Sequence, residues 1–400
     1  MILLLLISEG SILEMNLITE KWRRFVNEGG NVFKGERVDS IPLEFIEPTL
    51  DRYYEELSRL FPNYSGLFQT FAPLGSVGKK AKSGDIDLAV DVQELFPSGQ
   101  VDEASLQSWG LDPQKWQETY DRMYQRARTA TEVDVQLRAF LYEIAKYIGE
   151  NSKMIKTDLK QVGPGLMFSL FPQISDTGEQ QDVGVQIDWM LGNKNWLKFS
   201  YSSPFPSEQQ PMLKGLHRTQ LILAMFGAKG YSFKHRTGVY DKATGEMVAS
   251  SPEEVSSLLE KIYGARITPE NLESFSTIYD WLMANASEED INGAFDSYLR
   301  ILDSTRGNKE TDPATGQSRR CGYVPEELED YWLQNWERLG LKGKFLCKSV
   351  NQRLGDAISE IKEAKKWSKK YKRSINCSNP KGFSQKQYCK RQKRGGSYKS

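Results

Sequence analysis

The stretch Leu74–Asp91, LGSVGKKAKSGDIDLAVD, joins a tight turn, a lysine-rich loop and a charged strand within a short length of chain. Side chains at i and i+2 of a strand point to the same side of a sheet, so Asp85 and Asp87 are predicted to share one face. The alternate positions are apolar and can anchor the other face in a core: Ile86, Leu88 and Val90. The pattern predicts a half-buried strand with two carboxylates on its open face.

Two neighbouring carboxylates repel each other, and this arrangement is costly unless a cation lies between them. Mg²⁺ prefers hard oxygen ligands and retains waters, so Asp85 and Asp87 are predicted to ligate magnesium, with Mn²⁺ as the alternative ion. A solvated strand face without a metal is the other explanation for an Asp-x-Asp pair taken alone.

The Gly75–Ser76 turn precedes this strand and is a candidate phosphate site. Glycine lets the backbone approach a ligand closely, and successive N–H groups with a serine hydroxyl form a concave anion site. Lys79 and Lys82 add positive charge beside it, although solvent-exposed lysines would give the same pattern. A phosphate cradle next to a metal-binding strand suits a nucleoside triphosphate bound through Mg²⁺.

A third carboxylate is expected from a later strand. The run Asp182–Leu191, DVGVQIDWML, alternates apolar side chains with Gly184, Gln186, Asp188 and Met190. This alternation predicts a strand with one apolar face and with Asp188 on the other.

These residues resemble the polymerase-beta-like nucleotidyltransferase superfamily, whose pattern is Gly-Ser, a spacer of roughly ten residues and Asp-x-Asp between apolar positions. The resemblance implies an α+β fold, a polymerase-beta-like palm with a mixed sheet, a helical insertion and a helical C-terminal domain. The separation of Asp87 from Asp188 is longer than in compact members, so a sizeable insertion is expected between them. The chain as a whole also resembles nucleotidyltransferases of large tailed phages.

The resemblance implies metal-dependent transfer of a nucleoside monophosphate from an NTP or dNTP to an acceptor hydroxyl, with release of pyrophosphate. Two Mg²⁺ ions held mainly by Asp85 and Asp87 would neutralise the triphosphate and lower the pKa of the attacking hydroxyl. Asp188 would complete the metal site on the side of the nucleophile.

In this superfamily the segment after the third-carboxylate strand often lines the nucleotide pocket. The resemblance therefore implies nucleotide contacts from five residues: Ser200, Ser202, Lys214, His217 and Arg218. Lys214 and Arg218 are spaced i, i+4 on the predicted helix KGLHRTQLILAMF and share one of its faces. A solvated basic first turn is the alternative.

The length favours a catalytic core with additions rather than one domain. We expect an N-terminal extension over 1–40, a catalytic domain over 41–211 with a helical insertion near 112–150, a mainly helical domain over 212–360 and a basic tail over 361–400.

Local patterns predict a helix over 47–61, strands over 67–74, 154–159 and 166–172, and a hairpin over 238–248. They also predict helices capped by Ser251, Thr268 and Ser287, an exposed loop over 305–321 and a helix over 353–370.

The charge distribution points to a polyanionic partner. Net charge is formally zero, but 14 of the 53 Lys and Arg lie in 361–400, where Glu363 is the one acid. Aromatic side chains are interleaved with these bases, which allows phosphate contact together with base stacking. An RNA or DNA end is therefore the expected acceptor, and a solubilising tail is the alternative.

Two other functions stay open at this point. The acceptor could be a protein or a small molecule, as in toxin-like or antibiotic-modifying relatives of the superfamily. A nonenzymatic nucleic-acid-binding protein on a degenerate transferase fold is the alternative from another class, although three retained carboxylates argue against it.

The N-terminal run MILLLLI lacks the basic region and cleavage site of a signal peptide and is far shorter than the roughly 20 residues of a membrane span. No membrane association is expected. The four cysteines show no CxxC pairing, so reduced thiols in a cytoplasmic protein, or in the host cytoplasm for a viral one, are the expectation.

Overall fold

The computed structural model describes residues 32–33, 35–75, 77–79, 81–127, 130–203, 215–304, 308–311, 318–321, 324–341 and 377–378. The chain divides into two compact units, of which Asn27–Tyr298 is one and the remainder is the other. Every predicted site residue that the structure describes belongs to the unit Asn27–Tyr298.

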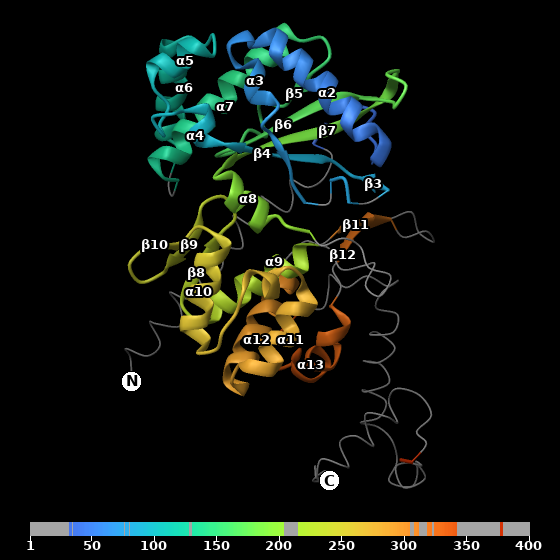
Figure 1. The fold of residues 1–400 in the computed structure, drawn as a ribbon, viewed down its shortest axis with the longest axis vertical. Helices are drawn as coiled ribbons and strands as arrows, with labels where there is room; N and C mark the ends of the chain where they lie inside the picture. The colour runs from blue at the N-terminus through green and yellow to red at the C-terminus, as the bar shows by residue number, and fades with distance from the viewer. Residues whose placement is uncertain are drawn as a thin grey trace. The chain divides into compact units, whose positions relative to one another are not determined.

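The unit Asn27–Tyr298 contains a five-stranded mixed sheet (Figure 1). Asp87 and Asp188 lie on two of its strands, and Asp85 immediately precedes one of them. Its order is β2 (Ala72–Pro73), β4 (Ile86–Asp91), β7 (Gln180–Gly192), β6 (Leu166–Ile174) and β5 (Lys156–Thr157). Strands β4 and β7 run parallel, and the other neighbours are antiparallel. Parallel neighbours need a crossover connection, and here that connection contains α4 (Val92–Leu95), α5 (Glu103–Ser108), α6 (Pro113–Tyr124) and α7 (Glu132–Asn151). The expected combination of a mixed sheet with helices is therefore present.

Helices α2 (Leu43–Leu60) and α7 cover one face of this sheet (Figure 1). The apolar side chains of β4 and β7 enter the same core, including Leu88 and Trp189. Trp189 Nε1 donates a hydrogen bond to the Tyr53 hydroxyl of α2 at 2.9 Å, and that hydroxyl lies 2.9 Å from Ser169 Oγ on β6. These hydrogen bonds link buried polar side chains of three elements on the covered face, and Asp87 and Asp188 lie on the other face.

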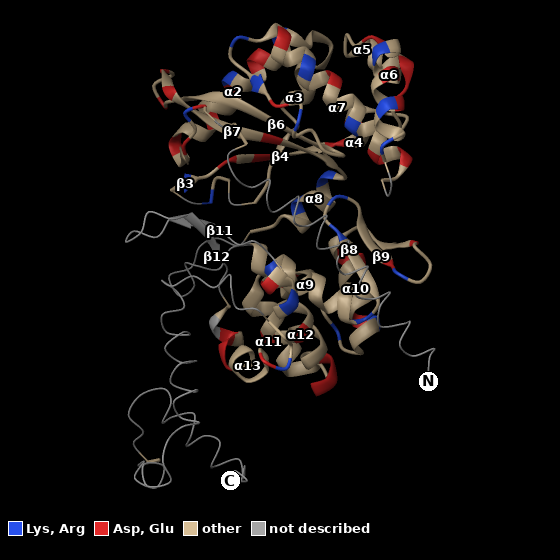
Figure 2. Cartoon of the chain, turned by 180° about the vertical axis from the view of Figure 1, so that it is seen from behind, with Lys and Arg blue, Asp and Glu red and all other residues tan. Residues whose placement is uncertain are grey.

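Helices α6 and α7 form where the sequence pattern predicted helices. Asp112 caps α6 by accepting hydrogen bonds from the backbone N–H groups of Gln114 and Lys115, and Thr131 caps α7 in the same way. Basic and acidic positions are intermixed over α6 in Figure 2, so its surface does not carry a single sign of charge.

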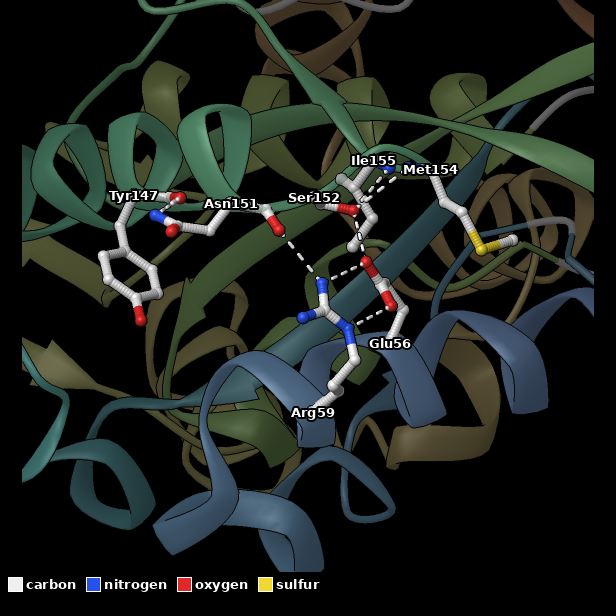
Figure 3. A network of polar contacts seen from close by, with 7 residues as sticks. All are labelled: Glu56, Arg59, Tyr147, Asn151, Ser152, Met154 and Ile155. Atoms are coloured by element: carbon white, nitrogen blue, oxygen red, sulfur yellow. Dashed lines mark hydrogen bonds and ion pairs between the residues drawn. The ribbon is translucent and has the colours of Figure 1, made fainter.

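A polar network joins α2 to the segment between α7 and β5 (Figure 3). Glu56 accepts hydrogen bonds from Arg59 Nε at 2.9 Å and from Arg59 Nη2 at 2.8 Å. Ser152 Oγ donates to the same carboxylate at 2.6 Å, and Arg59 also donates to the Asn151 carbonyl at 3.0 Å. The Arg59 side chain holds the pKa of Glu56 below its ordinary value, so the network favours the ionised carboxylate.

The remaining elements have the following bounds: β1 (Ile41–Pro42), η1 (Pro62–Tyr64), α3 (Ser65–Phe68), β3 (Lys82–Ser83), α8 (Lys194–Ser200), α9 (Gly215–Ala228), β8 (Tyr231–Lys234), β9 (Gly238–Asp241), β10 (Met247–Ala249), α10 (Pro252–Tyr263), η2 (Pro269–Leu272), α11 (Phe275–Asn285), α12 (Glu288–Ser304), β11 (Asn308–Thr311), β12 (Ser318–Cys321), η3 (Glu326–Leu328) and α13 (Glu329–Asn335). The predicted hairpin is present as β9 and β10, and Ser251 caps α10 as expected.

The predicted first strand over 67–74 was mostly wrong. Only Ala72–Pro73 forms a strand, and Ser65–Phe68 is helical. Phe68 and Phe71 both pack their rings against Trp189, and a spacing of three residues suits a helical turn rather than the alternation of a strand.

Two further local predictions were correct only in part. The N-cap at Thr268 and its first-turn proline are present, but they begin the short 3₁₀ turn η2, and α11 begins later, where Ser274 and Thr277 form a capping box of their own. The expected loop over 305–321 contains the antiparallel pair β11 and β12, whose backbone pairing does not depend on apolar alternation. The predicted helix over 353–370 and most of the basic tail lie outside the described residues.

Among the described residues, no helix combines the length and hydropathy needed to cross a bilayer.

Cys377 is disulfide-bonded, so the expectation of a reduced thiol was wrong there. Cysteine spacing along the chain does not show which sulfur atoms approach in space.

Candidate metal centre

Strand register brings the three predicted metal ligands together. Asp87 on β4 pairs with Asp188 on the parallel strand β7, so both side chains lie on the face opposite the core. Asp85 immediately precedes β4 and lies two residues before Asp87. One carboxylate oxygen from each of the three lies within 4.8 Å of the other two.

The electrostatics of this cluster favour a bound cation. Burial raises the pKa of Asp87 well above its ordinary value, and the negative charge of Asp85 raises it further. Asp188 is only 3% exposed, so water screens its carboxylate poorly. A divalent ion would remove the repulsion that this arrangement creates.

The donor set fits a hard divalent ion. Oxygens that share one Mg²⁺ at about 2.1 Å each lie about 3–4 Å apart, and the three carboxylates approach within 4.8 Å of one another. All three ligands are carboxylates, which suit Mg²⁺ or Mn²⁺ better than the softer metals that select thiolate or imidazole. Asp85, Asp87 and Asp188 are therefore the residues that would hold the metal.

The glycine turn lies beside the cluster. Gly75 has φ of +62°, and a Cβ atom at this position would be 3.7 Å from Asp87 Oδ2. Leu74 donates its backbone N–H to the Asp87 carbonyl at 2.9 Å, and Gly75 forms a parallel bridge with Ser202. The turn thus runs along the metal-binding strand, as a phosphate cradle would require. Ser76 lies outside the described residues.

The two loop lysines differ. Lys79 is half-buried and donates from Nζ to the Ser203 carbonyl at 2.7 Å. Burial lowers the pKa of Lys79, and the positive charge of Arg218 lowers it further. Lys82 is exposed on β3 opposite Pro42, so its position matches the solvated alternative.

The serines after β7 also differ in their surroundings. Ser200 is buried at the end of α8, and its hydroxyl donates to the His235 carbonyl at 2.7 Å. Ser202 is half-buried, and its backbone pairs with Gly75. Of the two, Ser202 is the one that the structure shows next to the turn.

His217 and Arg218 are buried within the helical region, so the alternative of a solvated basic turn was wrong for both. His217 Nδ1 lies 2.6 Å from the Tyr298 hydroxyl. Arg218 donates from Nη1 to the Phe199 carbonyl at 2.8 Å and from Nε to the Leu272 carbonyl. Its guanidinium also lies over the Phe199 ring, and burial lowers its pKa to about 10. Lys214 lies outside the described residues.

One polar residue of the site was missed in the sequence. Gln186 is buried on β7 and donates from Nε2 to Asp188 Oδ2 at 3.0 Å. Its position two residues before Asp188 on the same strand face was the signal that could have identified it.

No protein-family model matches the chain, and no curated protein matches it either. The chain has a weak similarity to the structure of Leishmania infantum polymerase beta in a ternary P/T complex, with 14% sequence identity and a TM-score of 0.27. That match covers 64% of this chain and 76% of the other. For the ternary gap complex of the same polymerase, the identity is 14%, the coverage is 64% and 70%, and the TM-score is 0.24. Similarity at this level does not establish a function for the chain.

Proposed function

We propose that the protein is a metal-dependent nucleotidyltransferase of the polymerase-beta-like type. The observation that carries this proposal is the convergence of Asp85, Asp87 and Asp188 from two parallel-paired segments, with ligand oxygens within 4.8 Å of one another, beside the turn at Gly75. The proposed catalytic domain is residues 41–211, followed by a mainly helical domain over 212–360.

The reaction is transfer of a nucleoside monophosphate from an NTP or dNTP to an acceptor hydroxyl. The hydroxyl oxygen forms a bond to the α-phosphorus, the bond from that phosphorus to the α,β-bridging oxygen breaks, and pyrophosphate leaves. Mg²⁺ bound between the carboxylates supplies charge neutralisation and a lower pKa for the attacking hydroxyl.

The residues of the chain have separate roles in this proposal. Asp85 and Asp87 would hold the metal that neutralises the triphosphate, and Asp188 would act on the side of the nucleophile and receive the hydroxyl proton. The backbone at Gly75 approaches the phosphates closely because no side chain intervenes. Lys79 adds positive charge at the end of the same loop.

The proposed acceptor is an RNA or DNA end. The support for it is the concentration of 14 Lys and Arg in 361–400 beside a single acid. A basic segment of this kind binds phosphate backbones through their charge and favours no sequence.

The test is incubation of the protein with radiolabelled NTPs, Mg²⁺ or Mn²⁺ and a mixed pool of RNA, DNA and protein. Label on a nucleic-acid end is the expected result, and Asp87→Asn should abolish it. Asp182→Asn is the matched control, because Asp182 lies on β7 but is exposed and outside the cluster.

Label on protein or on a small molecule would keep the transferase and overturn the nucleic-acid acceptor. Absence of transfer with both metals and all acceptors, from a protein that still binds RNA or DNA, would overturn the enzyme in favour of a nonenzymatic nucleic-acid-binding protein.

A further inference from the structure

Gln186 connects the third aspartate to the chain that precedes the sheet. Its side chain is 2% exposed and lies on the same face of β7 as Asp188. Nε2 donates to Asp188 Oδ2 at 3.0 Å, and Oε1 accepts a hydrogen bond from the backbone N–H of Val32 at 3.1 Å. Two hydrogen bonds in series therefore join Val32 to a proposed metal ligand.

The two partners determine the orientation of the Gln186 amide. An ionised carboxylate can only accept hydrogen bonds, and a backbone N–H can only donate. Rotating the amide by 180° would place its oxygen against Asp188 and its NH₂ group against the N–H of Val32, so both hydrogen bonds would be lost. Losing a hydrogen bond in a buried place costs about 1–3 kcal/mol, which makes one orientation strongly preferred.

A neutral donor suits this position chemically. A lysine or arginine beside Asp188 would neutralise its charge and compete with a cation for it. The amide of Gln186 holds one oxygen of the carboxylate and adds no charge, so the full negative charge is left for the metal. The second oxygen, Oδ1, is also out of contact with solvent.

The segment that contains Val32 is attached to β7 by further backbone contacts. Gly184 donates its N–H to the Arg37 carbonyl at 2.9 Å and accepts from the Asp39 N–H at 3.1 Å. On the neighbouring strand β6, the Gln173 side chain also donates to the Asp39 carbonyl at 3.1 Å. This part of the expected N-terminal extension therefore packs on the strand that carries Asp188.

We propose that Gln186 is a positioning residue that orients Asp188 for metal binding, and that the backbone at Val32 keeps Gln186 in place. This inference rests on the proposed function, because it assumes that Asp188 is a metal ligand. Residues that orient metal ligands typically change metal affinity by about 10–100-fold when they are replaced.

The test is titration of the full-length protein with Mn²⁺ alone, with free Mn²⁺ measured by its electron paramagnetic resonance signal. Gln186→Leu should weaken Mn²⁺ binding by about 10–100-fold. Gln181→Leu is the matched control, because Gln181 lies on the same strand and, among the described residues, its side chain donates only to the nearby Glu179 carbonyl. Its Mn²⁺ affinity should equal that of the wild type.

A second pair of variants tests the link to Val32 without changing the core. Val32→Pro removes the backbone N–H that donates a hydrogen bond to Gln186 Oε1. It should therefore weaken Mn²⁺ binding, as Gln186→Leu should. Val32→Ala keeps the N–H and should bind like the wild type. Thermal unfolding in EDTA should be similar for both Val32 variants, which separates positioning from general loss of stability.

Equal Mn²⁺ affinity in wild type, Gln186→Leu and Val32→Pro would overturn the inference while leaving the metal centre in place. A wild-type protein that binds no Mn²⁺ would overturn the metal centre itself, and with it both the proposed function and this inference.

Discussion

Asp87 on β4 and Asp188 on β7 occupy paired positions in a parallel register. The next pair, Leu88 with Trp189, points to the other face of the sheet and lies in the core. A shift of either strand by one residue would exchange its faces, placing a carboxylate in the apolar core and an apolar side chain among the metal ligands. The packing that keeps these strands in register therefore also keeps the metal ligands together.

Replacing Asp87 should stabilise the metal-free protein while abolishing activity. The raised pKa of Asp87 means that its ionised form is unfavourable in the folded state at neutral pH. Asp87→Asn removes this repulsion, and we expect a gain of about 0.5–2 kcal/mol in the free energy of unfolding in EDTA. The same variant should lose the stabilisation that Mn²⁺ gives to the wild type. Urea unfolding with and without Mn²⁺ measures both effects, and a large loss of stability in EDTA would mean that Asp87 is structural.

The glycine turn allows a matched pair of substitutions. Gly75 and Gly78 have φ of +62° and +74°, and a side chain at either position costs about 1–2 kcal/mol of strain. A Cβ at Gly75 would contact Asp87, whereas one at Gly78 would meet no atom within 4 Å. Gly75→Ala and Gly78→Ala should therefore lose similar stability, but only Gly75→Ala should lower kcat/KM for the nucleotide strongly. Equal kinetic losses would show that the loop acts through its backbone strain alone.

His235 should make the fold sensitive to acid. Both of its ring nitrogens are out of contact with solvent, and burial lowers its pKa to about 3. An unfolded histidine binds a proton below about pH 6.5, so between these values the unfolded state binds more protons and stability falls as the pH falls. From pH 7 to pH 5 this contributes a loss of about 2 kcal/mol.

Urea unfolding at pH 7 and pH 5 checks this expectation. The difference between the two pH values should be about 2 kcal/mol larger in the wild type than in His235→Leu. Equal differences in the two proteins would show that His235 does not cause the acid sensitivity.

Glu56 should contribute more to stability than the adjacent Glu55. The Glu56 side chain is 11% exposed and binds both Arg59 and Ser152, whereas Glu55 is 65% exposed and pairs with Arg52. We expect Glu56→Ala to cost about 1–3 kcal/mol and Glu55→Ala about 0–0.5 kcal/mol. Because the folded pKa of Glu56 is lowered, its contribution is present above the unfolded pKa and is lost as the pH falls through the folded value. Urea midpoints at pH 7 compare the two variants, and similar losses would contradict the expectation.

Removing residues 361–400 should weaken binding to RNA or DNA. The deletion takes away 14 basic residues and one acid, so the loss should be largest at low salt. Mn²⁺ binding should not change, because the three aspartates remain. Filter binding at two salt concentrations measures the affinity, and an unchanged affinity would reject the role of the tail.

Much of the site follows from local patterns in the chain. The alternation of apolar and acidic residues in IDLAVD and QIDWML predicts which side chains share a face, because side-chain direction in a strand depends only on the spacing of residues. Asp112, Thr131 and Ser251 cap helices as their neighbours indicate, because a cap is a contact within one turn of chain. The order of the three aspartates along the chain could also be predicted from local patterns. The same is true of the helices between Asp87 and Asp188.

Other features depended on contacts between distant residues. The parallel register of β4 and β7 places Asp87 opposite Asp188, and Gln186 reaches Val32 across 154 positions of sequence. The burial of Arg218 against the carbonyls of Phe199 and Leu272 could not be predicted from the sequence either. Basic residues at the start of a predicted helix equally fit a solvated first turn. The chain alone specifies which side of its own strand or helix a residue occupies. Which groups then meet depends on how the strands align and what covers them, because pairing and burial are collective properties of the packed sheet and helices.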